Sequence, residues 1–65
     1  MYKNKIKETR KKQGITLIQL SERTGVSVGY ICHLEKGTRK NPSVQVMEKI
    51  AVALNKSIYD VFFEE

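Results

Sequence analysis

The side chains with the widest chemical range in this 65-residue chain are its one cysteine and its one histidine, Cys32 and His33, which are adjacent. A single cysteine cannot form an internal disulfide, and one cysteine with one histidine supplies too few ligands for structural zinc. Serines and carboxylates occur, but their spacing forms no set of nucleophile, base and orienting group. Because 65 residues also leave little room for a substrate pocket, we expect no enzyme, no metal and no cofactor.

The charged residues are unevenly distributed along the chain. The net charge is +5, and residues 1–40 carry ten Lys or Arg against three Glu, a balance of +7. Residues 41–65 carry two Lys against four acidic residues, a balance of −2. A basic half on a small domain is typical of a nucleic-acid binder, although a solvated lysine-rich face without a partner remains an alternative.

The elements that position Cys32 and His33 lie within residues 16–37. Thr16 and Gln19 have the spacing of a capping box at a helix start. Gly25 ends that helix, and Ser27 can cap a second one that Gly37 stops. Two short helices around one glycine turn are the signature of a helix-turn-helix. Their apolar residues are expected to meet in one core: Leu17, Leu20, Val26, Ile31 and Leu34.

A helix is also predicted before this unit, over residues 2–13, with Gly14 as its left-handed stop. One face of it carries Tyr2, Ile6, Thr9, Arg10 and Gln13. Since Arg10 points inward, it needs a carboxylate partner, because an unpaired buried charge is too costly.

Two more helices are predicted after residue 42. Ser43 can cap the first of them, and its 3.6-residue apolar repeat is the clearest in the chain: Val44, Met47, Ile50, Ala51 and Leu54. Ser57 can cap the last helix, which directs Ile58, Val61 and Phe62 to the core. Tyr59 and Phe63, four residues apart, form a second apolar stripe on this helix.

The pattern as a whole predicts an all-α fold and a single domain over residues 1–65, because a chain of this length can fill only one core. No apolar run approaches the roughly 20 residues that span a bilayer, and the N-terminus lacks the apolar segment of a signal peptide. We therefore expect a cytoplasmic protein.

These residues resemble the phage-repressor or Cro-like helix-turn-helix domain, the XRE family, over about residues 4–63. The resemblance rests on the combination of Ile6, Arg10, Gly14, Thr16, Leu20, Gly25-Val26-Ser27, Tyr30-Ile31, Leu34-Glu35-Lys36-Gly37, Asn41-Pro42-Ser43, Ile50-Ala51, Leu54 and Ile58 to Phe62. It implies a compact five-helix, lambda-repressor-like domain whose second and third helices form the helix-turn-helix. It also implies a partly buried ion pair between Arg10 and Glu35, which both lie on inward faces.

In this family the third helix lies in the DNA major groove and the second crosses the backbone. The resemblance implies base contacts by Gln19, Val28, Gly29, Cys32 and His33. It implies backbone contacts by Thr16, Leu17, Ser27, Tyr30, Lys36, Arg39, Lys40, Asn41 and Ser43. Family members often carry Gln, Arg or Asn at the reading positions, whereas Val28, Gly29 and Cys32 offer no bidentate hydrogen bonds. Direct readout should therefore be sparse, with more discrimination by DNA shape.

We predict a sequence-specific, double-stranded DNA-binding regulator, a repressor that binds a palindromic operator as a homodimer. Its dimer interface is expected at Tyr59, Phe62 and Phe63, and no small-molecule ligand is evident. The alternative is an antitoxin or other protein-interaction module that masks a partner protein through the exposed patch of Tyr59 and Phe63. Cys32 is expected to be a small, partly exposed filler rather than a redox sensor.

Overall fold

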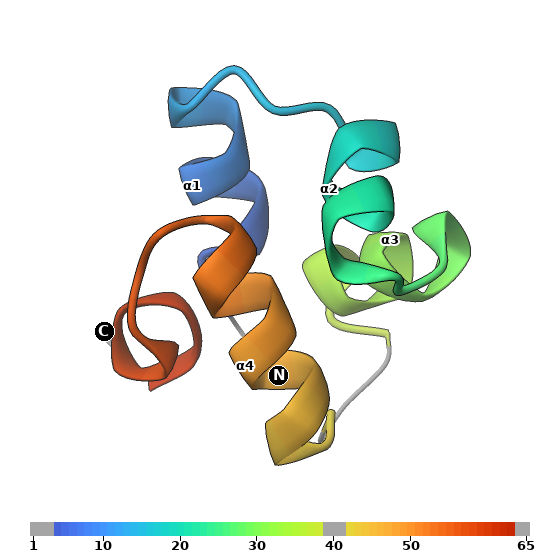
Figure 1. Ribbon diagram of the computed structural model, residues 1–65. Coiled ribbons are helices and arrows are strands. Elements are labelled where there is room, and N and C mark those ends of the chain that lie inside the picture. Colours follow the sequence, from blue (N-terminus) through green and yellow to red (C-terminus); the bar gives the residue numbers. More distant parts are fainter. Residues whose placement is uncertain (1–3, 39–41, 64–65) are drawn as a thin grey trace.

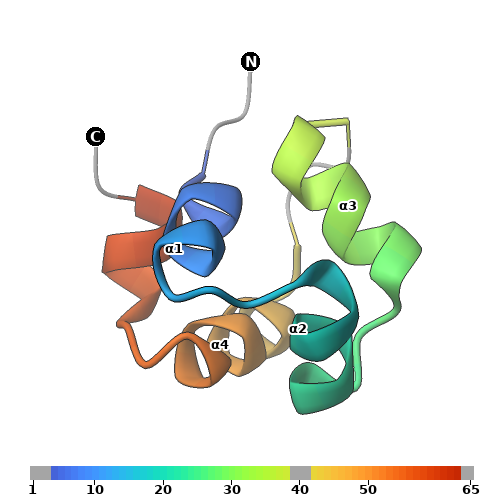
Figure 2. The same ribbon diagram turned by 90° about the horizontal axis from the view of Figure 1, so that it is seen from above.

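The computed structural model describes residues 4–38 and 42–63. The described residues form α1 (Ile6–Lys12), α2 (Leu17–Thr24), α3 (Val28–Lys36), α4 (Val44–Ala53) and a last helix, η1 (Tyr59–Phe63), and contain no strand. The prediction of an all-α, five-helix fold is confirmed. Helix α2 contacts α3 and α4, while α1 contacts α3 and η1. Figures 1 and 2 show α3 on the flank opposite to η1.

The predicted caps define the starts of three helices. At α2, Thr16 Oγ1 accepts from the Gln19 amide at 3.0 Å, and Gln19 Oε1 accepts from the Thr16 amide at 2.9 Å, which is a complete capping box. Ser27 Oγ accepts from the Tyr30 amide at α3, and Ser43 caps α4 in the same way. Each cap satisfies an amide that has no partner within its helix.

The turn between α2 and α3 is fixed by Gly25 and two side chains. Gly25 adopts φ +75°, which L side chains rarely adopt. The buried Thr24 hydroxyl donates to the Leu20 carbonyl at 2.8 Å and accepts from the Val26 amide at 3.1 Å. Ser21 Oγ donates to the Val26 carbonyl at 2.6 Å. These bonds hold α3 at one angle to α2.

A single apolar core is shared by all five helices. Its buried members are Ile6, Ile15, Leu20, Val26, Ile31, Leu34, Met47, Ile50, Ala51, Leu54, Val61 and Phe62. Helix α3 contributes Ile31 and Leu34, both fully buried. The core therefore fixes which face of α3 remains outside.

Both ends of the described chain differ from the sequence expectation. The first helix begins at Ile6, where Asn4 Oδ1 accepts from the Ile6 amide at 3.0 Å, rather than at Tyr2, which lies outside the described residues. The last helix is a five-residue π-helical turn. Its Phe62 is 4% exposed and packs in the core, so the assignment of Phe62 to a dimer interface is wrong, and its predicted inward position is confirmed.

Candidate functional site

The outward face of α3 combines small, uncharged residues with one histidine. Val28, Gly29 and His33 are exposed and Cys32 is half-buried, while Ile31 and Leu34 face the core. A Cβ built at Gly29 would meet no atom within 4 Å, so nothing in the fold requires glycine at this point. The structure thus brings four of the five predicted base-reading residues onto one helix face.

Gln19, the fifth predicted base-reading residue, is engaged in the capping box of α2. Its Oε1 is bonded to the Thr16 amide, so a bidentate contact through both ends of its amide requires the box to open. The Thr16 amide, a predicted phosphate donor, is occupied by the same bond. The Leu17 amide lies in the first turn of α2, where a helix N-terminus favours an anion.

Hydroxyl and basic groups flank the outward face of α3. Ser27 Oγ uses a lone pair in its cap, which leaves the hydroxyl hydrogen able to donate to a phosphate, and the same holds for Ser43. Lys36 is exposed in the last turn of α3, and Tyr30 is half-buried with its side chain packed on the core. The remaining predicted backbone contacts, Arg39, Lys40 and Asn41, lie outside the described residues.

At the C-terminal end of α3, His33 contacts Thr38, a residue that the sequence patterns did not single out. His33 Nδ1 lies 2.9 Å from Thr38 Oγ1, and the same hydroxyl lies 3.2 Å from the carbonyl oxygen of His33. Both side chains are exposed. The imidazole of the only histidine in the chain is therefore held in one orientation on this face.

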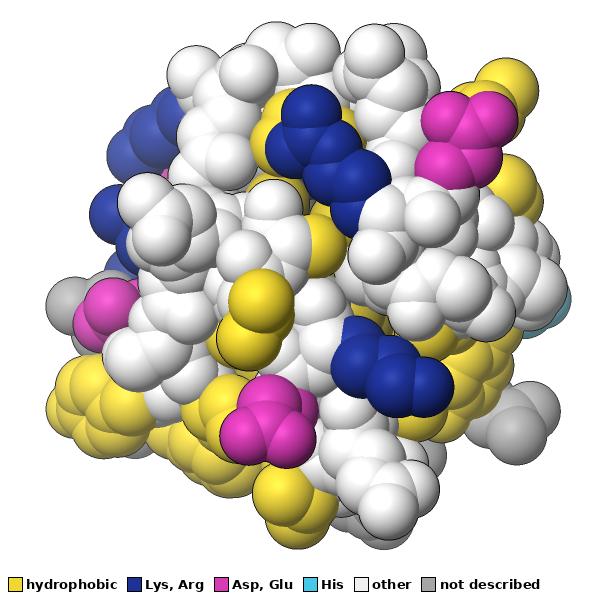
Figure 3. Space-filling view, in the orientation of Figure 1, with side chains coloured by type: hydrophobic (Ala, Val, Ile, Leu, Met, Phe, Trp, Pro, Cys, Tyr) yellow, Lys and Arg dark blue, Asp and Glu magenta, His cyan; other side chains and the backbone are white. Residues whose placement is uncertain are grey.

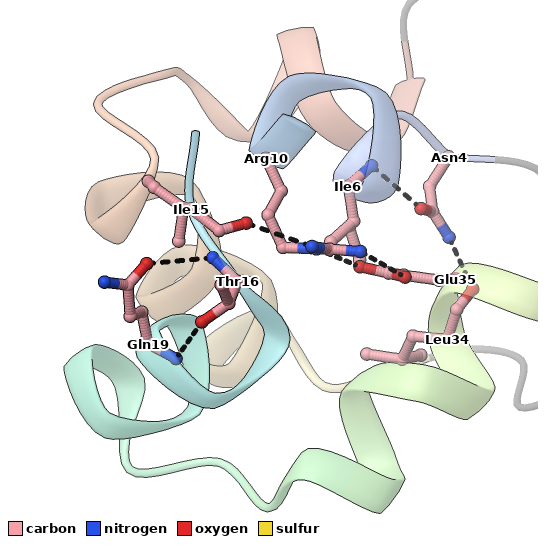
Figure 4. Close-up of polar contacts among 8 residues, drawn as sticks. All are labelled: Asn4, Ile6, Arg10, Ile15, Thr16, Gln19, Leu34 and Glu35. Carbon is pink, nitrogen blue, oxygen red and sulfur yellow. Dashed lines mark hydrogen bonds and ion pairs between the residues drawn. The ribbon is translucent and has the colours of Figure 1, made fainter. Parts of the chain in front are cut away.

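A buried polar network ties α1 to the back of α3 (Figure 4). Arg10 Nε donates to Glu35 Oε2 at 2.8 Å and Arg10 Nη2 donates to Glu35 Oε1 at 3.2 Å. Arg10 Nη1 donates to the Ile15 carbonyl at 3.0 Å, and Asn4 Nδ2 donates to the Leu34 carbonyl at 2.9 Å. The expected Arg10–Glu35 ion pair is present, whereas the Asn4 contact was not predicted. A polar residue just before a helix is a weak sign of such a contact.

The last helix carries two large exposed side chains. Tyr59 is 62% exposed and Phe63 is 55% exposed. Figure 3 shows hydrophobic side chains gathered over this helix at the lower left of the molecule. Because the core already contains Val61 and Phe62 from the same turn, Tyr59 and Phe63 form a separate outer stripe.

Residues 4–38 and 42–63 contain no group of three or more His, Cys, Asp or Glu side chains that could hold a metal ion. No helix in these ranges is long and apolar enough to cross a bilayer. Cys32 is a free, half-buried cysteine.

A family model described as helix-turn-helix matches residues 6–61. The chain is 34% identical over 65 residues to the HTH-type transcriptional regulator SinR of Bacillus subtilis, covering 100% of this chain and 59% of that protein. It is 34% identical over 61 residues to the immunity repressor protein of Bacillus phage phi105, covering 94% of this chain and 42% of that protein.

Among solved structures, the chain resembles the crystal structure of SinR, "the master regulator for biofilm formation", in complex with DNA. The TM-score is 0.81 at 36% identity, with 85% of this chain and 87% of that chain covered. This chain therefore has the same fold as SinR in that structure. It spans less than two thirds of the full length of SinR and of the phage repressor.

Proposed function

The chain belongs to the XRE-type helix-turn-helix family of transcriptional regulators, and from this premise we propose that it is a sequence-specific, double-stranded DNA-binding repressor. Helix α3 lies in the major groove and α2 crosses the backbone, the docking geometry of helix-turn-helix proteins. The observation that carries this proposal is the outward face of α3, which is small and uncharged while Ile31 and Leu34 anchor its other side. The likeness to DNA-bound SinR supports the same orientation.

The proposed base contacts are few and partly apolar. Val28 and Cys32 contact thymine methyl groups, Gly29 lets the helix approach closely, and His33 bonds to a base edge. Gln19 adds a contact from α2 only if its capping box opens. Because none of the apolar contacts is bidentate, DNA shape supplies much of the discrimination.

The proposed phosphate contacts surround this face. The Leu17 amide contributes one contact, and the Thr16 amide contributes another if the capping box opens. The side chains proposed to contact phosphate are Ser27, Tyr30, Lys36 and Ser43, together with Arg39, Lys40 and Asn41, which lie outside the described residues. Hydrogen bonds and charges directed at phosphate fix the register of the protein but carry no sequence information. The affinity should therefore depend steeply on salt.

We further propose that the protein binds a palindromic operator as a homodimer through Tyr59 and Phe63. Two half-sites one helical turn apart, roughly 34 Å, match two copies of α3 related by a two-fold axis. Figure 2 shows the last helix on the flank opposite to α3, so that a dimer contact through the last helix would leave the outward face of α3 uncovered in each copy. Occupying an operator in this way blocks other proteins from the same DNA, which agrees with the repressor name of the phage relative.

Binding rather than catalysis is the proposed activity, and we propose that it takes place in the cytoplasm. Selection of bound sites from random DNA tests it directly, and a recovered palindrome is the expected result. In gel shifts, log affinity should fall against log salt with a slope of about −0.9 per phosphate contact.

A pair of matched variants separates the reading face from the rest of the surface. Val28→Glu places a carboxylate against the DNA and should abolish binding, whereas Val52→Glu, at an exposed valine of α4, should not. Wild-type protein without DNA affinity at low salt would contradict the proposal. It would favour the alternative, a module that masks a partner protein.

A further inference from the structure

Thr38 is placed beside His33 by the way α3 ends. Gly37 adopts φ +79°, its amide donates to the Leu34 carbonyl at 3.2 Å, and the Thr38 amide donates to the His33 carbonyl at 3.1 Å. These two bonds form a Schellman motif, which fixes the backbone of the residue after the glycine. The Thr38 hydroxyl is consequently held close to the His33 ring by backbone geometry.

The two contacts of the Thr38 hydroxyl constrain the placement of the His33 proton. The hydroxyl has one hydrogen, and it lies 3.2 Å from a carbonyl oxygen that can only accept and 2.9 Å from His33 Nδ1. If its hydrogen pointed to Nδ1, the Thr38 hydroxyl oxygen and the His33 carbonyl oxygen would face each other with no proton between them. Both contacts are satisfied only when the hydroxyl donates to the carbonyl and Nδ1–H donates to the hydroxyl.

A neutral imidazole with its proton on Nδ1 has an unprotonated Nε2, which is a hydrogen-bond acceptor. In the major groove, acceptors pair with the amino groups of adenine N6 and cytosine N4, whereas guanine presents the acceptors N7 and O6. A phosphate oxygen is also an acceptor and does not pair with this nitrogen. The tautomer thus decides which base edge His33 can read.

We propose that Thr38 is a positioning residue that fixes the His33 tautomer, so that neutral His33 selects a base that presents an amino group in the major groove, adenine or cytosine, over guanine. The part of this inference that concerns bases rests on the proposed function. The part that concerns the tautomer rests only on the contacts within the chain. The two parts are therefore tested separately.

The tautomer is measured by nitrogen-15 NMR of the imidazole at about pH 8.5, where model imidazoles are neutral. Only one histidine is present, so its two ring nitrogens are assigned without ambiguity. Wild type should carry the proton on Nδ1. Thr38→Val, which keeps the backbone amide and the shape but loses the hydroxyl, should shift the population toward Nε2–H, the form that free imidazole side chains favour. Thr38→Ser should restore the wild-type signals.

A wild-type ring protonated on Nε2, or a tautomer unchanged in Thr38→Val, would overturn the role of Thr38. Loss of packing alone cannot imitate the expected result, because Thr38→Ser removes a methyl group and keeps the hydroxyl. This readout needs no DNA and stands whether or not the proposed function does.

Base selection is measured by selecting sites from random DNA at the same pH with wild type and with Thr38→Val. At one position of each half-site, preference for adenine or cytosine over guanine should fall by about five-fold in the variant, the worth of one hydrogen bond. The other positions should not change. An unchanged preference, or an equal loss at every position, would overturn the assignment of His33. Absence of any binding by wild type would instead overturn the proposed function, and the base assignment with it.

Discussion

The guanidinium of Arg10 and the carboxylate of Glu35 form a two-pronged ion pair that fastens α1 to the inner side of α3, with side chains only 9% and 5% exposed. Arg10 Nη1 donates to the Ile15 carbonyl in the connection between α1 and α2. One side chain therefore joins α1 and the connection between α1 and α2 to the proposed reading helix, α3.

Removing one partner of this pair should be strongly destabilising. Glu35→Gln leaves a buried guanidinium without its counter-charge, and the free energy of unfolding in urea should fall by about 3 kcal/mol. The double variant Arg10→Met with Glu35→Leu should lose less than the sum of the two single changes, because no charge remains unpaired. Glu8→Gln is the control, since the exposed Glu8–Lys12 pair at 3.3 Å should contribute under about 0.5 kcal/mol. Equal effects of Glu35→Gln and Glu8→Gln would refute this account.

The second prediction separates stability from binding at Gly29. Because a Cβ there meets open space and φ is ordinary, Gly29→Ala should stabilise α3 by about 1 kcal/mol through helix propensity. The added methyl group should weaken DNA binding, since it stands between the helix and the bases. Gly25→Ala is the contrast: it also meets no atom within 4 Å, but at φ +75° it should cost about 1–2 kcal/mol. Thermal unfolding and gel shifts measure the two effects, and a destabilised Gly29→Ala would contradict the prediction.

Local chemistry explains how much of this fold was predictable from the sequence. The caps at Thr16, Ser27 and Ser43 and the glycine stops depend on residues within one helical turn, and all appear where their spacing placed them. The inward position of Ile31 and Leu34 followed from helical periodicity alone. Periodicity also placed Arg10 and Glu35 on inward faces, and the family resemblance supplied their pairing.

What the sequence did not reveal depends on contacts between segments. Asn4 bonds to the Leu34 carbonyl, a residue 30 positions away, and no local pattern encodes that distance. The contact between Thr38 and His33 depends on the Schellman turn, which brings the Thr38 hydroxyl to the His33 ring. The last helix closes as a π-helical turn rather than an α-helix. Phe62 shows the same limit, because the sequence assigned it both to the core and to the dimer interface, and only its packing in the folded chain decided between the two.

The third prediction concerns Ser27, which has both a structural and a proposed DNA-binding role. Ser27→Ala should cost about 1 kcal/mol of unfolding free energy through the lost cap. It should also weaken DNA binding several-fold at fixed salt, without changing the sequence preference, because the hydroxyl is proposed to contact phosphate. Ser57→Ala is the matched control, since Ser57 Oγ caps the Asp60 amide at 3.0 Å in the last helix. If both variants lost stability alike but neither lost affinity, Ser27 would be a cap only.

The fourth prediction assigns a phosphate contact to Lys36. Lys36→Gln should weaken binding to all DNA sequences by a similar factor and make the salt slope shallower by about 0.9, the effect of one lost charge contact. Lys56→Gln changes the net charge equally, but Lys56 lines a pocket with residues of α1 and with Asp60 of the last helix, and with no residue of α3. It should leave the slope unchanged. A change of sequence preference in Lys36→Gln would mean that its contact is to a base.

The fifth prediction tests the homodimer through the exposed stripe of the last helix. Tyr59→Ser with Phe63→Ser removes two aromatic side chains that are 62% and 55% exposed, so the monomer should keep its stability while the dimer dissociates. Sedimentation across a range of protein concentrations should show this shift toward monomer. Val52→Ser, at a valine that is 71% exposed on α4, should leave the association unchanged. With dimerisation lost, binding to a palindromic site should weaken far more than binding to a single half-site, because the second half-site no longer adds its contacts. An unaltered sedimentation profile would place any dimer contact elsewhere on the surface.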